Sequence, residues 1–332
     1  MNPERIMRMA SAFYESCVLF SASDLGVFAA LARLGSADAG VLAQACGLDA
    51  RGGRLLFDGC VAIGLLDKSG ERYANAPEAA AYLVPGNPGD LSGALRYNRD
   101  VYAAWGKLPE LARTGRPVEA PAIHLGADPA RTRAFVMAMH GRALAIGRGA
   151  VAQIDLAGCR TLLDVGGGPG TMAALLAGAN PGLQCRVIEL PAAAAIAGEL
   201  LKAQGMEERV TMVPGDYHET EFPAGNDAVL FSGVLHQESP EAIRKLFTRA
   251  YAVLNPGGRV YVLDMMTDAS HAQPAFSALF AVNMALTTQS GWVFSDTELR
   301  GWLEGAGFSD FVCKALPPPL PHWLARAGRV AP

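Results

Sequence analysis

Residues 160–170 read Arg160-Thr-Leu-Leu-Asp-Val-Gly-Gly-Gly-Pro-Gly170. The apolar run Thr161–Val165 predicts a buried strand, and Thr171–Ala179 predicts the helix that follows the glycines. A strand, a glycine-rich turn and a helix in this order form a cradle for a nucleotide or nucleoside in open α/β sheets. Glycines let the backbone adopt positive φ and approach a ligand closely, and the helix N-terminus offers unpaired N–H groups.

Two cofactors are candidates for this turn, NAD and S-adenosylmethionine (SAM). A dinucleotide fold prefers G-x-G-x-x-G, whose third glycine lets the helix pack closely under the pyrophosphate. Gly166 and Gly168 fit that pattern, but Thr171 stands at the third glycine position. Asp164 on the strand followed by G-x-G-x-G is instead similar to motif I of SAM-dependent methyltransferases. Glu189, at the end of the next predicted strand, is placed to hold a ribose, which both cofactors contain. We therefore expect SAM.

The composition is typical of a well-buried globular protein. Apolar residues make up 51% of the 332 residues, charged residues 18%, and the net charge is −4. This balance argues against nucleic acid as the main partner. The six cysteines lack paired metal-ligand spacing, so we expect reduced thiols, no bound metal and a cytoplasmic protein. The charged first turns do not fit a signal peptide, and no apolar run is long enough to span a membrane.

The first part of the chain has a helical pattern with short breaks, which predicts a domain over residues 1–93. Residues 38–66 resemble a helix-turn-helix, Asp67–Glu71 is expected to be a turn, and Arg72–Ala74 a short wing strand. This order predicts a winged-helix module. Residues 1–100 carry a net charge of −2, whereas phosphate binding needs a basic face. Dimerisation is therefore expected rather than DNA binding.

The remainder of the chain divides into connecting helices and a catalytic domain. Residues 94–155 are expected to be helical, with one long helix over Arg131–Ile154, and to help roof the active site. Over residues 156–332 apolar runs alternate with helical stretches, which predicts a doubly wound, mostly parallel sheet of the Rossmann-like, class I methyltransferase type. The predicted strands are Thr161–Val165, Cys185–Ile188, Val210–Val213, Ala228–Ser232 and Arg259–Asp264.

Short fragments spread over nearly the whole chain resemble the plant-type O-methyltransferases, the group that holds the caffeate and acetylserotonin O-methyltransferases. Those in the first half are Leu25-Gly-Val-Phe28, Trp105-x-x-Leu108, Thr114-Gly-x-Pro117 and Phe135-x-x-x-Met139. Those in the second half are the glycine-rich turn, Glu189-Leu-Pro191, Gly215-Asp-Tyr217, Val234-Leu-His236, Asn255-Pro-Gly-Gly258 and Gly305-Ala-Gly-Phe308. Each fragment is short, but their order is specific. The resemblance implies a bacterial member of this family that forms a homodimer through its N-terminal domains.

The resemblance also implies which residues bind SAM. The strand aspartate and the glycines would face its amino-acid end, the glutamate would hold the ribose, and the Asp-Tyr pair would flank the adenine. The implied cofactor-binding residues are Asp164, Gly166, Gly168, Glu189, Leu190, Asp216, Tyr217 and Ser232.

A histidine stands at the family's catalytic position. Methyl transfer to a hydroxyl needs an aligned nucleophile and a base that removes its proton, a role that imidazole performs near neutral pH. The resemblance implies that this base is His236. Relatives commonly have His-Asp-Trp, whereas this chain has His236-Gln-Glu238, and Val293 occupies the position of the family's acidic partner. We therefore expect His236 to lack its usual carboxylate, with Glu238 as a candidate substitute.

The predicted function is SAM-dependent methylation of a small, partly apolar molecule, at a hydroxyl. The expected acceptor-site residues are Tyr97, Trp105, Met139, His140, Arg142, Phe280, Asn283, Met284 and Trp292. The alternatives are a thiol, thioether or carbon acceptor, a SAM-binding relative that does not methylate, and a SAM-responsive winged-helix regulator. Four further histidines lie in polar loops or the tail and are expected to have no role: His124, His218, His271 and His322.

Overall fold

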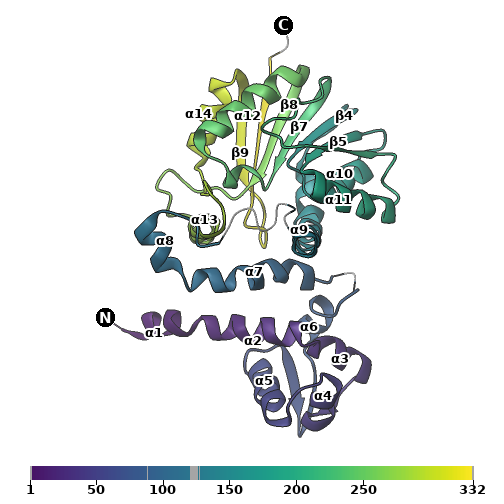
Figure 1. The fold of residues 1–332 in the computed structure, drawn as a ribbon, viewed down its shortest axis with the longest axis vertical. Coiled ribbons are helices and arrows are strands. Elements are labelled where there is room, and N and C mark those ends of the chain that lie inside the picture. The colour runs from purple at the N-terminus through teal and green to yellow at the C-terminus, as the bar shows by residue number, and fades with distance from the viewer. Residues whose placement is uncertain (1, 88, 120–125, 127, 331–332) are drawn as a thin grey trace. The chain divides into compact units, whose positions relative to one another are not determined.

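A computed structural model describes residues 2–87, 89–119, 126 and 128–330. The chain separates into two compact units, residues 1–99 and residues 100–332. The N-terminal unit has one hydrophobic core, and the C-terminal unit has one on each face of its sheet (Figure 1).

The N-terminal unit combines short helices with a small antiparallel sheet of order β1-β3-β2. Asp38 and Asp49 begin α4 and α5, because their carboxylates accept hydrogen bonds from the first-turn N–H groups. The expected turn over Asp67–Glu71 is shorter than predicted, since residues 67–69 continue a strand that pairs with Arg72–Asn75. The elements are α1 (Glu4–Ser11), α2 (Phe13–Asp24), α3 (Val27–Leu34), β1 (Ala37–Asp38), α4 (Ala39–Ala45), α5 (Ala50–Ala62), β2 (Leu66–Ser69), β3 (Arg72–Asn75) and α6 (Pro77–Tyr82). Helix α7 (Ser92–Trp105) begins in this unit.

Apolar side chains at the start of the N-terminal unit are exposed. In α1 and the first turn of α2 they are Ile6, Met7, Met9, Phe13 and Tyr14, with exposed fractions between 48% and 65%. Helix α1 contains no buried residue. A helix with an uncovered apolar stripe is typical of an element that packs against a partner.

The C-terminal unit is built on a seven-stranded sheet of order β6-β5-β4-β7-β8-β10-β9. Strands β6, β5, β4, β7 and β8 are parallel, and β10 and β9 pair antiparallel at one edge. All five predicted strands are present, whereas β9 and β10 are additions to the prediction. The strands are β4 (Thr161–Val165), β5 (Gln184–Glu189), β6 (Val210–Pro214), β7 (Asn226–Ser232), β8 (Leu254–Asp264), β9 (Phe308–Ala315) and β10 (Trp323–Arg329).

Helices cover both faces of this sheet (Figure 1). Alternate residues of the central strands enter different cores. Leu163 and Val229 pack with α12 and α14, while Leu162 and Leu230 pack with α10 and α11. This period of two explains why the strands read as continuous apolar runs. The helices are α8 (Leu108–Thr114), α9 (Pro129–Ala150), η2 (Val151–Gln153), α10 (Thr171–Ala179), α11 (Pro191–Ala203), η3 (Leu235–Gln237), α12 (Pro240–Val253), α13 (Ala275–Thr287) and α14 (Asp296–Gly305).

A helix that crosses a bilayer is about 20 residues long and mostly apolar. No single described helix is long and apolar enough, whereas one bent pair, Glu4–Asp24 with Val27–Leu34, reaches that length and composition together.

Candidate active site

The glycine-rich turn between β4 and α10 needs glycine at several of its positions. Gly166, Gly168 and Gly170 have φ of +67°, +56° and +69°, a region that other residues rarely adopt. A Cβ on Gly166 would lie 2.6 Å from Cγ2 of Val234, and one on Gly167 would lie 2.5 Å from Oδ2 of Asp164. The turn therefore packs its backbone directly onto the ends of the strands.

Asp164 lies beneath this turn and has a perturbed carboxyl group. Its side chain is 0% exposed, and neither oxygen has a hydrogen-bond partner among the described residues. Burial, and secondarily the charge of Glu189, raises the pKa of Asp164 to about 7. An orphaned buried carboxyl group is costly, so this position suits a ligand that brings hydrogen-bond donors.

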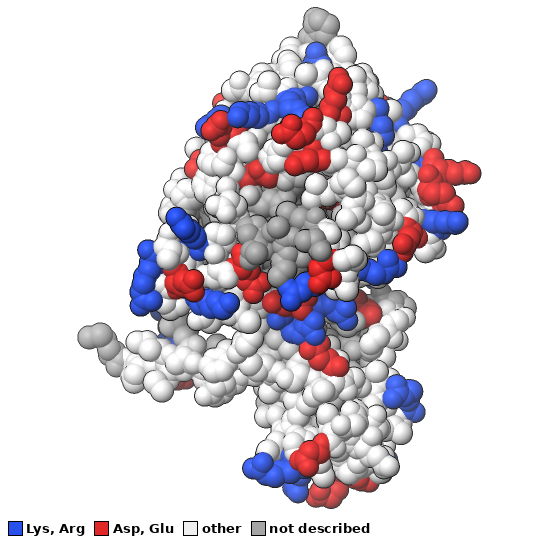
Figure 2. All heavy atoms as spheres, viewed as in Figure 1, with Lys and Arg blue, Asp and Glu red and all other residues white. Residues whose placement is uncertain are grey.

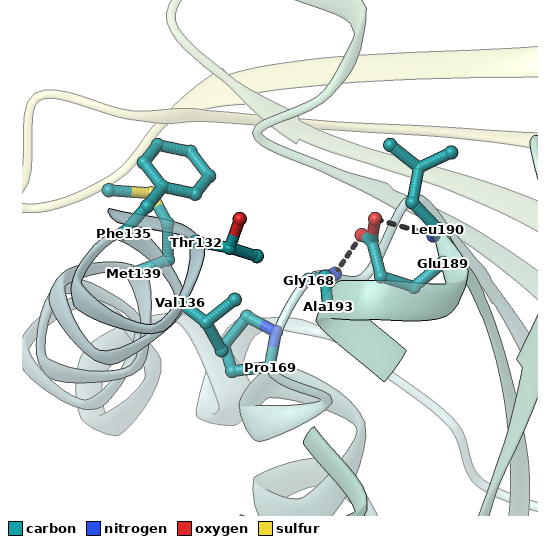
Figure 3. Close-up of a pocket in the computed structure, with 9 residues that line it drawn as sticks. All are labelled: Thr132, Phe135, Val136, Met139, Gly168, Pro169, Glu189, Leu190 and Ala193. Carbon is teal, nitrogen blue, oxygen red and sulfur yellow. Dashed lines mark hydrogen bonds between the residues drawn. The ribbon is translucent and has the colours of Figure 1, made fainter. Parts of the chain in front are cut away.

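Glu189 ends β5 and is fixed by two backbone groups. Its Oε2 accepts a hydrogen bond from the N–H of Gly168 at 2.8 Å, and its Oε1 accepts one from Leu190 at 2.7 Å (Figure 3). Burial raises the pKa of Glu189, while these two hydrogen bonds lower it. Each oxygen keeps a further lone pair, so the carboxylate can still accept from the two hydroxyls of a ribose.

A recess beside the Glu189 carboxylate lies between the glycine-rich turn and helix α9 (Figure 3). Gly168, Glu189, Leu190 and Met139, all expected at the site, contribute to it. The sequence prediction missed the others as site residues, although Phe135 and Met139 occupy one helix face in the Phe-x-x-x-Met fragment. The recess is lined by Thr132, Phe135, Val136, Met139, Gly168, Pro169, Glu189, Leu190 and Ala193.

The ring of Tyr217 packs against the glycine-rich turn at Gly166. A Cβ built on Gly166 would lie 3.2 Å from the Tyr217 ring. Its hydroxyl donates to Oε1 of Glu238 at 2.6 Å and accepts from the amide of Gln237 at 3.0 Å. Burial, followed by the charge of Glu238, raises the pKa of Tyr217. Asp216 is exposed, and its carboxylate caps the N–H of His218 at 2.8 Å.

His236 has a carboxylate partner, contrary to the sequence expectation. Its Nδ1 lies 2.5 Å from Oδ1 of Asp264, and its backbone N–H donates to Oδ2 at 3.3 Å. Asp264 ends β8, the neighbour of the strand that precedes His236, and is 1% exposed. Val293 does not leave the imidazole unpaired, because the acid comes from a different element. Asp264 is already the last residue of a predicted strand, and only the strand order was missing.

Glu238 contacts a different group from the one expected. Its carboxylate bonds the hydroxyl of Tyr217, as described above, and lies 3.2 Å from Nε2 of His218. The backbone carbonyl of Glu238 accepts from the indole N–H of Trp292 at 2.9 Å. Glu238 thus holds the Tyr217 side chain, and Asp264 is the carboxylate beside the His236 imidazole.

Phe280 and Trp292 contact His236, and Arg142 contacts Phe280. The ring of Phe280 meets the imidazole edge-on with centroids 5.1 Å apart, and the guanidinium of Arg142 lies 5.3 Å from the Phe280 centroid. Trp292 donates its backbone N–H to the carbonyl of His236 at 2.9 Å. The structure therefore brings together three of the predicted acceptor-site residues around the histidine.

The other predicted acceptor-site residues have defined places. The indole of Trp105 donates to the side-chain oxygen of Asn283 at 2.9 Å, which gives the buried amide a partner. Nδ1 of His140 lies 2.7 Å from the Thr171 hydroxyl, and burial lowers the pKa of His140. Met284 is buried on the same helix as Asn283. Tyr97 belongs to the N-terminal unit, and Ser232 ends β7.

His322, expected to have no role in a polar tail, is 7% exposed, and its Nδ1 has no hydrogen-bond partner among the described residues. His124 lies outside the described residues. Within the described part of the chain, no group of three or more His, Cys, Asp and Glu side chains has an arrangement that could hold a metal ion.

The chain matches two protein families in sequence. Residues 119–309 match the O-methyltransferase domain family, and residues 7–85 match the O-methyltransferase dimerisation domain family.

Individual relatives agree with these families. The 3-hydroxy-5-methyl-1-naphthoate 3-O-methyltransferase of Streptomyces sahachiroi is 32% identical over 93% of this chain and 90% of its own length. The tetracenomycin polyketide synthesis 8-O-methyltransferase of Streptomyces glaucescens is 32% identical over 93% of this chain and 92% of its own. The structure of human N-acetylserotonin methyltransferase in complex with SAM superposes with a TM-score of 0.90, at 27% identity over 100% of this chain and 99% of the human one.

Proposed function

The chain belongs to the SAM-dependent O-methyltransferase family, and from this premise we propose that it methylates a hydroxyl group of a small aromatic molecule, with His236 as general base. The observation that carries the proposal is the hydrogen-bonded pair of His236, in the middle of η3, and Asp264, the last residue of β8. The pair lies at the carboxyl end of the parallel strands, where α/β sheets bind their ligands.

The residues around the glycine-rich turn fit SAM. Asp164 offers a buried carboxyl group without a partner, which suits the ammonium end of the cofactor. Glu189 retains lone pairs for the ribose hydroxyls. Gly168 and Leu190 line the recess, and no described atom lies within 4 Å of a Cβ built on Gly168. Gly166, Asp216, Tyr217 and Ser232 are the further proposed contacts. SAM bound there supplies an activated methyl group on a sulfonium.

The chemical task of His236 follows from its hydrogen bond. Nδ1 donates its proton to Asp264 in the neutral tautomer, so the lone pair lies on Nε2. An acceptor hydroxyl beside Nε2 loses its proton to the imidazole as its oxygen becomes the nucleophile. Asp264 holds the tautomer and stabilises the cation that forms, the role that a carboxylate has in other histidine bases.

The walls near His236 favour an aromatic acceptor. Phe280 of α13 meets the imidazole edge-on, and Asn283 on the same helix accepts a hydrogen bond from the indole of Trp105. Two relatives at 32% identity are named for a hydroxynaphthoate and a tetracenomycin polyketide, both methylated on oxygen. We therefore propose a hydroxylated aromatic ring system as the acceptor, with a thiol or carbon nucleophile as the alternative.

We also propose that the protein is a homodimer held by its winged-helix-like N-terminal unit. The match to a dimerisation family over residues 7–85 and the exposed apolar side chains of α1 support this assembly. Over the face seen in Figure 2, Lys and Arg alternate with Asp and Glu, and the described residues there form no continuous basic surface. The free thiols of Cys46, Cys60, Cys159, Cys185 and Cys313 suit a reducing compartment such as the cytoplasm.

Transfer of labelled methyl from SAM tests the proposal. The purified protein is incubated with 2-naphthol, 2-naphthalenethiol or an electron-rich indole, and products are identified by mass. We expect transfer to the hydroxyl, and we expect His236→Ala to lose it while SAM affinity stays within a few-fold. Transfer to the indole carbon alone, or unchanged turnover by His236→Ala, would contradict the proposal.

A further inference from the structure

His322 lies beside the catalytic pair although it is far from it in sequence. It directly precedes β10, whose first residue, Trp323, pairs with Asp264 at the end of β8. The carbonyl of His322 accepts a hydrogen bond from the N–H of Leu316 at 2.8 Å, which closes the loop between β9 and β10. The backbone of His322 is therefore fixed at the end of the sheet where Asp264 holds the His236 imidazole.

The side chain of His322 is buried without full hydrogen bonding. It is 7% exposed, and no described residue is hydrogen-bonded to its Nδ1. A buried polar atom without a partner costs about 1–3 kcal/mol, and an apolar residue would avoid that cost. A ligand that supplies a hydrogen-bond partner for Nδ1 removes this cost.

The surroundings of His322 keep it neutral. Burial is the largest cause that lowers the pKa of His322 to about 4; Arg142 and His236 lower it further, and Asp264 raises it. A neutral imidazole has one donor and one acceptor nitrogen, so it can bind a hydroxyl or a carbonyl oxygen without carrying charge into the site.

The same neighbours form a continuous cluster. Phe280 touches the His236 ring edge-on, with centroids 5.1 Å apart, and carries the Arg142 guanidinium 5.3 Å from its own centroid. The charges of Arg142, Asp264 and His236 all reach His322. His322 thus adjoins the group that surrounds the proposed base, on the C-terminal strand pair that the sequence pattern did not reveal.

We propose that His322 is a specificity-determining residue of the acceptor site, whose Nδ1 hydrogen-bonds a second oxygen substituent on the aromatic acceptor. The inference rests on the proposed function, hydroxyl methylation of an aromatic ring. It narrows the acceptor class to rings that carry the methylated hydroxyl together with another hydroxyl, carbonyl or carboxylate oxygen.

Two acceptors and two variants test this role. The acceptors are 2-naphthol, with one oxygen, and 2,3-dihydroxynaphthalene, with two. His322→Leu removes the nitrogen but fills similar space, and His322→Asn keeps an amide near the position of Nδ1. The kcat/KM of methyl transfer is measured for each pair, with thermal unfolding and SAM affinity as controls for the fold.

We expect His322→Leu to lower kcat/KM for the dihydroxy compound by about 10- to 100-fold, the loss of one buried hydrogen bond, and to leave 2-naphthol within about 3-fold. His322→Asn should recover most of the loss. An equal loss on both acceptors, or none on either, would overturn the inference and leave the proposed function standing. Transfer to neither acceptor by the wild-type protein would overturn both.

Discussion

Replacing Asp164 by Asn tests two effects of the buried carboxyl group: it should destabilise the fold without ligand, and it should strengthen SAM binding. The pKa of Asp164 rises from 3.8 to about 7 on folding, and each unit corresponds to about 1.4 kcal/mol, so the ionised form destabilises the protein without ligand by about 4 kcal/mol. The folded state holds a proton that the unfolded state has released, and stability therefore falls as pH rises from about 4 to about 7. Asn does not ionise and avoids this loss.

The experiment is differential scanning calorimetry of wild type and Asp164→Asn at pH 5 and pH 8, without SAM. The unfolding temperature of the variant should exceed that of wild type clearly at pH 8 and much less at pH 5. SAM affinity should fall by about 10- to 100-fold, because a charge-assisted hydrogen bond contributes about 1.5–3 kcal/mol. A difference in unfolding temperature that is equal at both pH values, or an unchanged SAM affinity, would refute the reasoning.

Asp227→Asn provides the control with the opposite sign. Burial raises the pKa of Asp227, but hydrogen bonds from the Arg160 N–H, the Asn255 amide and Thr161 lower it by more. The pKa of this carboxyl group is therefore below its usual range. This carboxylate stabilises the protein above its ordinary pKa, and that stability is lost as pH falls. Asp227→Asn should therefore lower the unfolding temperature at pH 8.

Three further predictions address the site. Asp264→Asn should lower kcat by about 100-fold or more, because the amide no longer fixes the tautomer of His236. Calorimetry should show an unchanged SAM affinity, and a wild-type kcat would contradict the role of Asp264 beside His236. Glu238→Gln should weaken SAM binding through Tyr217 and leave kcat at saturating SAM within about 3-fold; a loss of kcat alone would return Glu238 to the catalytic machinery. No described atom lies within 4 Å of a Cβ built on Gly168, so Gly168→Ala should lower stability by only about 1–2 kcal/mol for its positive φ while reducing SAM affinity at least 10-fold. Intact affinity would show that no ligand approaches there.

The central strands and the glycine-rich turn were predictable because their signals are local. Thr161–Val165 is buried on both faces and reads as one apolar run, and the glycines follow it directly. Strand β9 is different, because its residues alternate between exposed and partly buried positions and include Asp310 and Lys314. An edge strand of this kind has no continuous apolar pattern.

The carboxylate partner of His236 and the burial of His322 depend on strand order rather than on local sequence pattern. Asp264 meets His236 because β8 lies beside β7, and His322 is buried because β10 enters between β8 and β9 out of chain order. The preceding run Pro317-Pro-Pro-Leu-Pro321 is typical of an exposed tail. The residues next to Asp264 and His322 give no sign of the Asp264–His236 contact or of the burial of His322. Only the three-dimensional arrangement reveals them.

The role of His236 as general base is tested most directly by varying the acidity of the acceptor. Methyl transfer by wild type and by His236→Ala is measured at saturating SAM, over a series of substituted 2-naphthols and on the corresponding thiol. A base matters less as the nucleophile ionises more easily, so the wild-type advantage should shrink steadily along the series and be smallest for the thiol. An advantage that stays constant across the series would contradict proton removal by His236.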